Sequence, residues 1–276
     1  MKPAPFTYHR ATSTREAVDM LASADDASVL AGGQSLVPLM NFRVAQPAHL
    51  VDINYVDELD YIRVDGGWLA IGARTRQAAV ERSADVARAA PLLSEAMRSV
   101  AHPPVRHRGT VVGSIAHADP AAELPAVLLA LDGEVVLRGA AGERTVAAAE
   151  FFTGPLMTAK APGELVTEVR VPAANGNGGG HALVEFSRRH ADFAVAGAAV
   201  AGDAIALFGV ADTPVRAADA ERLLAGDGGG DPGAVAAAAT EGLTPREDVH
   251  GGAAYRRRVA RACVERALRR ARGDAA

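Results

Sequence analysis

Two adjacent glycines followed by a hydroxyl residue form the first segment of this sequence that could bind a ligand. The segment AGGQS occupies residues 31–35, between an expected buried strand at 27–30 and a helix expected to begin at Leu36. Paired glycines let the chain turn sharply and let a ligand approach main-chain N–H groups. Ser35 can cap the helix, and successive N–H groups at a helix N-terminus suit a pyrophosphate. Taken alone, a tight turn that binds nothing explains the segment equally well.

A second segment, RGTVVGSIAHADPAAELP at 108–125, is dense in small residues that would let the backbone pass close to a flat ligand. We expect Asp119 to cap a helix that has Pro120 at its first position. Glu123 then lies one turn into this helix, either as a surface carboxylate stabilised by the helix dipole or as an acceptor for sugar or ribityl hydroxyls. Pro125 is expected to break or kink the helix.

The elements that must position these segments follow from the hydrophobic pattern. Ser13 and Glu16 have the spacing of a capping box, which predicts a helix running to Leu21. Further helices are expected at 77–83, 92–100, 217–224, 234–241 and 253–270. Strands are expected at 50–53, 68–72, 134–137 and 164–171, and three more at 181–187, 193–201 and 204–210.

The glycine-rich stretch PAANGNGGG at 172–180 marks the clearest boundary, because it has too few apolar side chains to bury a core. We therefore expect an N-terminal domain at 1–172, a linker at 173–180 and a C-terminal domain at 181–276. A second glycine-rich stretch at 226–233 lacks the GK[ST] ending of a phosphate loop, and it is expected to be a loop inside the second domain.

Composition excludes several classes of protein. The chain has 276 residues, 49% of them hydrophobic and 22% charged, which is typical of a globular protein. Its formal charge of −4 gives no general attraction to nucleic acid or anionic membranes. One cysteine, Cys263, can form neither an internal disulfide nor a cluster site by itself. With no signal peptide and no apolar run near the ~20 residues of a membrane helix, the expected location is cytoplasmic.

Other candidate sites are weaker. The spacing of His102, His107 and His117 does not make a compact metal-ligand set. The arginines at 256–270 are better explained by a helix that faces solvent or another subunit than by nucleic acid binding. No Ser-His-Asp set or carboxylate pair stands out, so we predict no metal ligand and no catalytic residue.

The first two segments, about eighty residues apart, resemble the FAD-binding segments in the medium subunit of molybdenum hydroxylases. That family includes the carbon monoxide dehydrogenase medium subunit and the FAD domain of xanthine dehydrogenase. The segment FSRRHADFA at 186–194 is similar to the start of the family's C-terminal domain, and residues 248–256 are similar to a segment near its end. Because the resemblance follows the family order over nearly the whole chain, it is far more specific than one AGG turn.

The resemblance implies an α+β fold with FAD as the cofactor. Residues 1–172 would form an FAD-binding domain of the vanillyl-alcohol-oxidase (PCMH) type, with lobes at about 1–57 and 58–172. Residues 181–276 would form a C-terminal domain of the CO dehydrogenase flavoprotein type, with a three-stranded antiparallel sheet and helices. Backbone amides would hold the pyrophosphate at Ala31, Gly32, Gly33, Gln34, Ser35 and Leu36. The remaining implied cofactor residues are Thr110, Gly113, Ser114, His117, Asp119, Glu123, Asp192 and Phe193.

The alternatives for these residues differ in kind. Asp119 is a helix cap on its local sequence, and Glu123 is implied to accept a ribityl or ribose hydroxyl. Asp192 and Phe193 would lie close to the isoalloxazine. Phe193 would either cover the isoalloxazine with its aromatic ring or pack in the core as part of a strand.

Two residues depart from the family pattern. Val112 replaces the first glycine of the family's TxGGS motif, and valine is costly if that position needs a positive φ. In some relatives a lysine precedes the third segment, whereas Val184 or Glu185 stands there in this chain, so the lysine's contact with flavin is not carried over.

The resemblance also implies partners, namely a molybdopterin-containing large subunit and a [2Fe-2S] small subunit in a dimer of heterotrimers. Electrons would pass from the clusters through FAD to an external acceptor, while the protein supplies position and electrostatics. Two alternatives stay open on the sequence. The chain could be a self-sufficient FAD-dependent oxidoreductase, or an assembly subunit that lost flavin through Val112. Neither the substrate nor the acceptor follows from the sequence.

Overall fold

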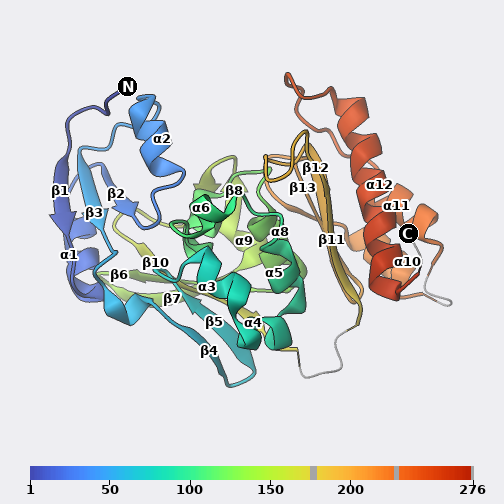
Figure 1. The fold of residues 1–276 in the computed structure, drawn as a ribbon, viewed down its shortest axis with the longest axis horizontal. Coiled ribbons are helices and arrows are strands. Elements are labelled where there is room, and N and C mark those ends of the chain that lie inside the picture. Colours follow the sequence, from blue (N-terminus) through green and yellow to red (C-terminus); the bar gives the residue numbers. More distant parts are fainter. Residues whose placement is uncertain (175–178, 227–229, 275–276) are drawn as a thin grey trace.

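A computed structural model describes residues 1–174, 179–226 and 230–274. Residues 175–178, which are half of the expected linker, and part of the expected loop at 226–233 therefore lie outside the described residues. Three bodies follow one another along the longest axis of the molecule: an N-terminal lobe, a second lobe with the largest sheet, and a C-terminal sheet covered by helices (Figure 1). Among the described residues, no helix is long and apolar enough to cross a membrane.

The N-terminal lobe is a small parallel sheet with two helices. Its strand order is β1-β3-β2, from Thr7–Arg10, His49–Asp52 and Ala27–Leu30. Helix α1 (Thr14–Ser23) begins as expected, because the Ser13 hydroxyl accepts the Glu16 N–H at 3.1 Å. The Glu16 carboxylate also accepts the N–H and the hydroxyl of Thr12, at 2.7 and 2.8 Å, just ahead of the helix. Helix α2 (Leu36–Asn41) follows the glycine pair.

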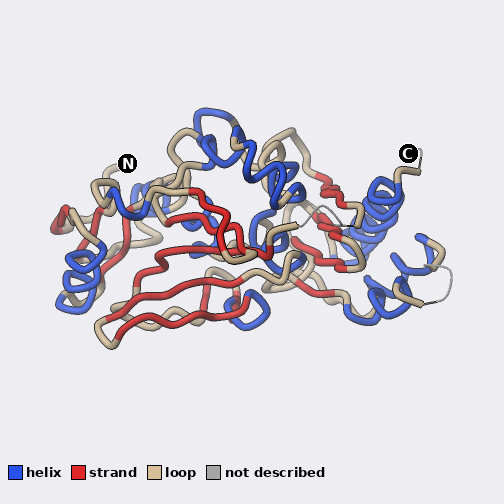
Figure 2. The backbone as a smooth tube through the Cα atoms, turned by 90° about the horizontal axis from the view of Figure 1, so that it is seen from below, coloured by secondary structure: helices blue, strands red, loops and turns tan. Residues whose placement is uncertain are grey.

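The second lobe is built on a five-stranded antiparallel sheet with the order β4-β5-β10-β6-β7. These strands are Ile62–Asp65, Trp68–Gly72, Leu165–Pro172, Glu134–Gly139 and Gly142–Ala147. The helical elements are η1 (Asp57–Leu59), α3 (Gln77–Arg82), α4 (Ala84–Ala89), α5 (Pro91–Ala96), α6 (Pro103–Arg106), α7 (Val111–His117), α8 (Glu123–Ala130) and α9 (Ala148–Phe151). A short hairpin of β8 (Phe152–Gly154) and β9 (Met157–Thr158) completes the lobe. Figure 2 shows the strands of this sheet along one side of the molecule, with several helices above them and a short helix at the lower edge.

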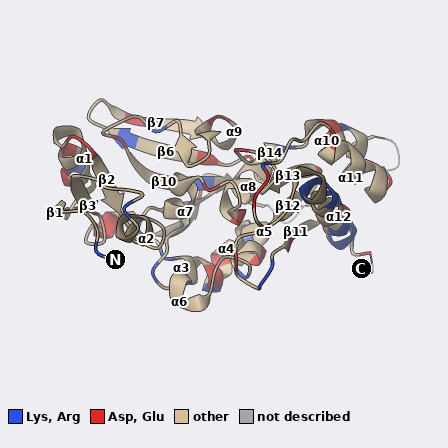
Figure 3. Ribbon diagram, turned by 90° about the horizontal axis from the view of Figure 1, so that it is seen from above, with Lys and Arg blue, Asp and Glu red and all other residues tan. Residues whose placement is uncertain are grey.

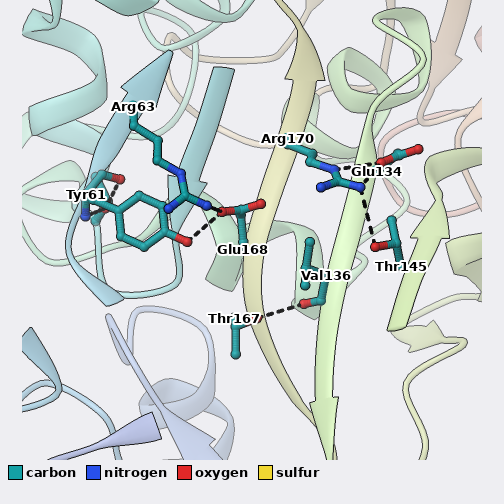
Figure 4. A network of polar contacts seen from close by, with 9 residues as sticks. Tyr61, Arg63, Glu134, Val136, Thr145, Thr167, Glu168 and Arg170 are labelled. Carbon is teal, nitrogen blue, oxygen red and sulfur yellow. Dashed lines mark hydrogen bonds and ion pairs between the residues drawn. The ribbon is translucent and has the colours of Figure 1, made fainter. Parts of the chain in front are cut away.

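Polar side chains join four strands of this sheet, β4, β10, β6 and β7 (Figure 4). The Tyr61 hydroxyl and the Arg63 guanidinium both donate to the Glu168 carboxylate, at 2.6 and 2.8 Å. Glu168 is buried, so these donors compensate for the loss of its hydration. Burial and the hydrogen bond to Glu168 also raise the pKa of Tyr61 above its usual range, which keeps the hydroxyl a donor.

Replacing Tyr61 with phenylalanine should lower the free energy of unfolding by about 1.5–3 kcal/mol, since it removes a hydrogen bond to a charged, buried acceptor. Urea unfolding of both proteins measures this difference. Tyr8→Phe provides a comparison, because the Tyr8 hydroxyl also donates to a carboxylate, that of Asp52, but its ring is half exposed. We expect the smaller loss for Tyr8→Phe, and equal losses would contradict the argument from burial.

The C-terminal domain has a four-stranded antiparallel sheet, not the three-stranded sheet expected from the family resemblance. The strands are β11 (His181–Phe186), β12 (Ala196–Ala201), β13 (Ala204–Phe208) and β14 (Val215–Arg216), in that order. Strand β14 is only two residues long and follows Pro214, so local sequence gives no strand pattern there. Helices α10 (Ala218–Leu224), α11 (Pro232–Thr240) and α12 (Ala253–Arg272) accompany the sheet, and the exposed side of α12 is lined with arginines (Figure 3).

The two faces of this sheet bury different cores. Ala182, Ala198 and Val200 pack toward the C-terminal helices, whereas Leu183, Ala199 and Phe208 join the core of the preceding domain. This division follows from the alternation of side chains along a strand. Helices α5 and α8 contact the second face, so the C-terminal domain is fixed against the second lobe.

Candidate cofactor-binding site

A cleft of about 1280 Å³ runs between the two N-terminal lobes and reaches the C-terminal domain. This volume exceeds the roughly 300–1,000 Å³ of a common small-molecule pocket, so the cleft suits a long ligand such as a dinucleotide. All fourteen cofactor residues expected from the sequence line it, from Ala31 to Leu36, from Thr110 to Glu123, and at Asp192 and Phe193. Their roles toward a cofactor stay predictions.

Close backbone packing joins the first two segments. A Cβ on Gly32 would lie 2.5 Å from the Arg108 carbonyl oxygen and 2.6 Å from the Gly109 Cα, so no side chain fits there. Gly33 has a φ of +70°, a conformation that glycine adopts without strain. Asn54 donates to the Ala31 carbonyl oxygen at 2.9 Å and accepts from Arg76, which also donates to the Arg108 carbonyl oxygen. Both glycines are therefore required by the fold of the cleft.

The amides of the first segment are available to a ligand. Within the described residues, no hydrogen bond uses the N–H groups of residues 32–35. Ser35 occupies the N-cap position of α2, but its side chain makes no capping hydrogen bond, contrary to expectation. These free donors lie on the cleft wall ahead of a helix start, an arrangement that favours an anion.

Within the second segment, residues 111–117 form helix α7. The Thr110 hydroxyl caps this helix by accepting the Gly113 N–H at 3.0 Å. Gly113 fits closely, since a Cβ there would lie 2.6 Å from the Thr110 Oγ1. Val112 is in the first turn of α7, is 2% exposed, and does not have a positive φ. Val112 therefore does not carry the backbone strain that a positive φ would cause. Its side chain packs in the core and lines the cleft wall.

Replacing Val112 with glycine should lower the free energy of unfolding by roughly 2–4 kcal/mol, because a buried side chain is lost and glycine is placed in a helix. The affinity for FAD should not rise. Chemical denaturation and a titration with FAD measure the two quantities. A tighter complex in the glycine variant would show that the valine obstructs the cofactor.

The turn between α7 and α8 differs from the expected helix start. Ala118 adopts the left-handed conformation and ends α7, and Asp119 accepts the Ala121 N–H at 2.9 Å in a local turn. Helix α8 then begins at Glu123, so Asp119 and Pro120 cap no helix. Pro125 lies in the first turn of α8, where a backbone N–H would have no acceptor within the helix, and α8 continues past it to Ala130.

Two titratable groups on this part of the wall are strongly affected by burial. Burial lowers the pKa of His117, which leaves its imidazole neutral at physiological pH. Burial raises the pKa of Glu123 to about 7. Glu123 is only 5% exposed, and its own backbone N–H is the one donor to its carboxylate within the described structure. A hydroxyl group of a ligand would supply the missing donor.

The third segment closes the cleft from the C-terminal domain. Phe193 is 62% exposed and precedes β12, so the alternative that it packs in the core of a strand is wrong. Asp192 and Phe193 both line the cleft, next to Ala191, which has a φ of +68°. The Val195 N–H donates to the Phe186 carbonyl oxygen at 2.8 Å and fixes the base of this loop.

Part of the cleft wall was not anticipated from the sequence. Strand β7 contributes Arg144, and the loop before β10 contributes Lys160 and Glu164. Arg144 forms a two-point ion pair with Glu164 at 2.7 and 2.8 Å, and burial lowers the pKa of the Lys160 ammonium. Neither segment carries a recognisable motif. They reach the N-terminal lobe through the pairing of β10 with β6, which the sequence does not reveal.

Sequence comparison identifies the class of protein that this fold and cleft define. Residues 4–174 match the FAD binding domain in molybdopterin dehydrogenase, and residues 181–271 match the CO dehydrogenase flavoprotein C-terminal domain. The chain belongs to the family of FAD-binding medium subunits of molybdenum hydroxylases, such as CO dehydrogenase.

Individual relatives match over almost their full length. The chain is 45% identical to the 6-hydroxypseudooxynicotine dehydrogenase complex subunit alpha of Paenarthrobacter nicotinovorans, covering 98% of this chain and 96% of the relative. It is 41% identical to the carbon monoxide dehydrogenase medium chain of Hydrogenophaga pseudoflava, covering 97% of each. The solved structure of carbon monoxide dehydrogenase from that organism superposes with a TM-score of 0.95, at 41% identity and 100% coverage of both chains.

Proposed function

We propose that this chain is the electron-transferring flavoprotein subunit of a complex that also contains a molybdopterin-bearing large subunit and a [2Fe-2S] small subunit. Support comes from the similarity to medium chains of carbon monoxide dehydrogenases and to a subunit of a dehydrogenase complex. A dimer of heterotrimers is the assembly that we propose. Bound FAD would accept electrons from the clusters of the small subunit and release them to an external acceptor.

The observation that carries the proposal is the convergence of three distant segments on one long cleft. The unpaired N–H groups of residues 32–35 would hold the pyrophosphate, since they combine free donors with a helix start. Glu123 would accept a hydroxyl of the ribityl chain or ribose, and the exposed ring of Phe193 would cover the isoalloxazine. These residues fit FAD because the cleft supplies anion donors, a hydroxyl acceptor and an aromatic face in one connected space.

The role of the protein in this scheme is positional. Neutral His117 and the apolar side chain of Val112 leave the α7 wall without a positive charge. The cleft residues therefore bind and orient the cofactor and exclude water from part of its surface, whereas no acid–base set is required of them.

Two measurements test the proposal. Purified chain incubated with FAD should retain about one flavin per chain after gel filtration, with the visible absorbance of a flavoprotein. Coexpression with candidate large and small subunits should yield one complex containing all three chains, and light scattering should give the mass of two heterotrimers. Failure to bind FAD under any reconstitution condition would refute the proposal. Turnover of a small molecule by the isolated holo-chain would favour a self-sufficient oxidoreductase instead.

A further inference from the structure

An arginine of the second lobe is bonded to the first ligand-binding segment through a chain of hydrogen bonds. Arg76 lies between β5 and α3, where its backbone forms an isolated antiparallel bridge with Thr110. Its Nη1 donates to the Arg108 carbonyl oxygen and its Nη2 donates to the Asn54 Oδ1, both at 2.5 Å. Because Asn54 belongs to the N-terminal lobe, Arg76 joins the two lobes beside residues 31–35.

Asn54 extends this contact to the backbone of the first segment. Its Nδ2 donates to the Ala31 carbonyl oxygen at 2.9 Å and to the Asp52 Oδ1 at 2.6 Å, and its backbone N–H donates to the same Asp52 atom at 2.8 Å. Asp52 is buried and also accepts the Tyr8 hydroxyl at 2.7 Å. Both amide hydrogens and the amide oxygen of Asn54 are therefore engaged, which fixes the orientation of its side chain.

The second acceptor of Arg76 is the atom against which Gly32 packs. A Cβ on Gly32 would lie 2.5 Å from the Arg108 carbonyl oxygen, so the two backbones meet at this point. Arg76 thus contacts both of them, one directly and the other through Asn54. A planar guanidinium holds two acceptors in a fixed geometry, which a flexible ammonium group does not. The side chain therefore determines how closely the first segment approaches the turn before α7.

The charge of Arg76 is not balanced by an adjacent carboxylate. Among the described residues, no ion pair includes Arg76, and its two side-chain acceptors are neutral amide oxygens. Burial and the charges of Arg108 and Arg74 lower the pKa of Arg76, and more distant carboxylates only partly offset this effect. The guanidinium nevertheless stays ionised at physiological pH. An anion bound on the other side of Gly32 would compensate this half-buried positive charge.

We infer that Arg76 is a positioning residue for the pyrophosphate of bound FAD: with Asn54 it aligns the unpaired N–H groups of residues 32–35, and the pyrophosphate balances its charge. The inference rests on the proposed function, because it concerns the same cleft. It also implies selectivity among ligands. FAD and ADP carry a pyrophosphate and would gain affinity from Arg76, whereas riboflavin ends at the ribityl chain and would not.

Titrations of the full-length chain with FAD, ADP and riboflavin test the inference. Arg76→Met should weaken the binding of FAD and of ADP by about tenfold to a hundredfold, and should change riboflavin binding by no more than about twofold. Arg74→Met is the matched control. Arg74 lies in the same connection, but it pairs with Asp57 and Asp60, so its loss should leave the affinity for FAD within about twofold of wild type. Equal losses for FAD and riboflavin would mean a general disturbance of the cleft and would overturn the inference.

A double variant tests whether Arg76 and Asn54 act through one chain of contacts. Asn54→Ala should weaken FAD binding by a factor similar to that of Arg76→Met, because it also releases the Ala31 carbonyl oxygen. The double variant should bind FAD no more than about threefold more weakly than the weaker-binding single variant, since residues of one hydrogen-bond network are not additive. Losses that multiply would show that the two side chains act independently, which would overturn the positioning role.

Arg76→Lys separates the charge from the geometry and serves as the test if the methionine variant does not fold, which near-UV circular dichroism reports. Lysine keeps the charge but not the planar fork, so FAD should still bind at least about fivefold more weakly than to wild type. Wild-type affinity in both Arg76→Lys and Asn54→Ala would overturn the inference and leave the proposed function standing. Absence of FAD binding to the wild-type chain would overturn both.

Discussion

Replacing Gly32 with alanine is expected to reduce the affinity for FAD by at least about a hundredfold. The added Cβ would lie 2.5 Å from the Arg108 carbonyl oxygen and 2.6 Å from the Gly109 Cα, and neither backbone atom can move independently of its loop. Relief of this contact must separate the 31–35 segment from the turn that leads into α7. A displacement of about 1 Å would misalign several N–H donors at once, and each hydrogen bond to a charged acceptor contributes about 1.5–3 kcal/mol.

A titration with FAD followed by flavin fluorescence measures this loss, and circular dichroism reports whether the chain is folded. Gly252→Ala is a suitable control, since a Cβ there makes only ordinary contacts, the closest at 3.5 Å, and the φ of Gly252 is −78°. We expect the control to bind FAD like wild type. Wild-type affinity in Gly32→Ala would show that the contact between the two segments does not organise the amides.

The parts of the cleft that could be predicted from the sequence are those whose chemistry is local. Gly32 and Gly33 have a conformational requirement that is visible in the residue types themselves. The Ser13 cap of α1 follows equally from neighbouring residues, and so do the strands of the C-terminal hairpin around Gly202 and Asp203. In each of these places, local propensity and the tertiary fold favour the same structure.

The parts that could not be predicted depend on distant segments. Lys160 and Arg144 reach the cleft only because β10 inserts between β5 and β6, and no spacing in the sequence encodes that strand order. The same reason explains β14, which becomes a strand by pairing with β13 despite its two-residue length. At Asp119 the local sequence predicts a helix cap that the tertiary structure overrides. Asp119 instead lies in a turn, and the Gly209 N–H donates to the Pro120 carbonyl oxygen in this turn.

The segment at 248–256 resembles the family without an evident role, and the structure supplies one through Arg256. This arginine is only 7% exposed, and its Nη1 donates to the carbonyl oxygens of Val195 and Gly209, at 2.6 and 3.1 Å. Its Nη2 donates to Asp248 at 2.5 Å. Val195 ends the loop that carries Phe193, and Gly209 donates to Pro120 in the turn before Glu123. One guanidinium therefore holds both the end of the loop that carries Phe193 and the strand end that contacts the turn before Glu123.

Replacing Arg256 with methionine, which keeps most of the apolar stem, should lower the free energy of unfolding by about 3–5 kcal/mol, since buried acceptors lose a charged donor. The affinity for FAD should also fall, because the loop carrying Phe193 loses its fixed end. Urea unfolding and an FAD titration measure both effects. Arg257→Met, on the exposed side of the same helix, should change stability by no more than about 0.5 kcal/mol.

Lysine at position 256 separates charge from geometry. Arg256→Lys keeps the positive charge near Asp248, but an ammonium group cannot span two carbonyl oxygens and a carboxylate in the planar arrangement of a guanidinium. We expect Arg256→Lys to recover less than half of the stability lost in Arg256→Met, and to leave FAD affinity close to that of the methionine variant. Full recovery by lysine would mean that charge alone holds the loop, and that the fork of hydrogen bonds to Val195 and Gly209 does not position Phe193.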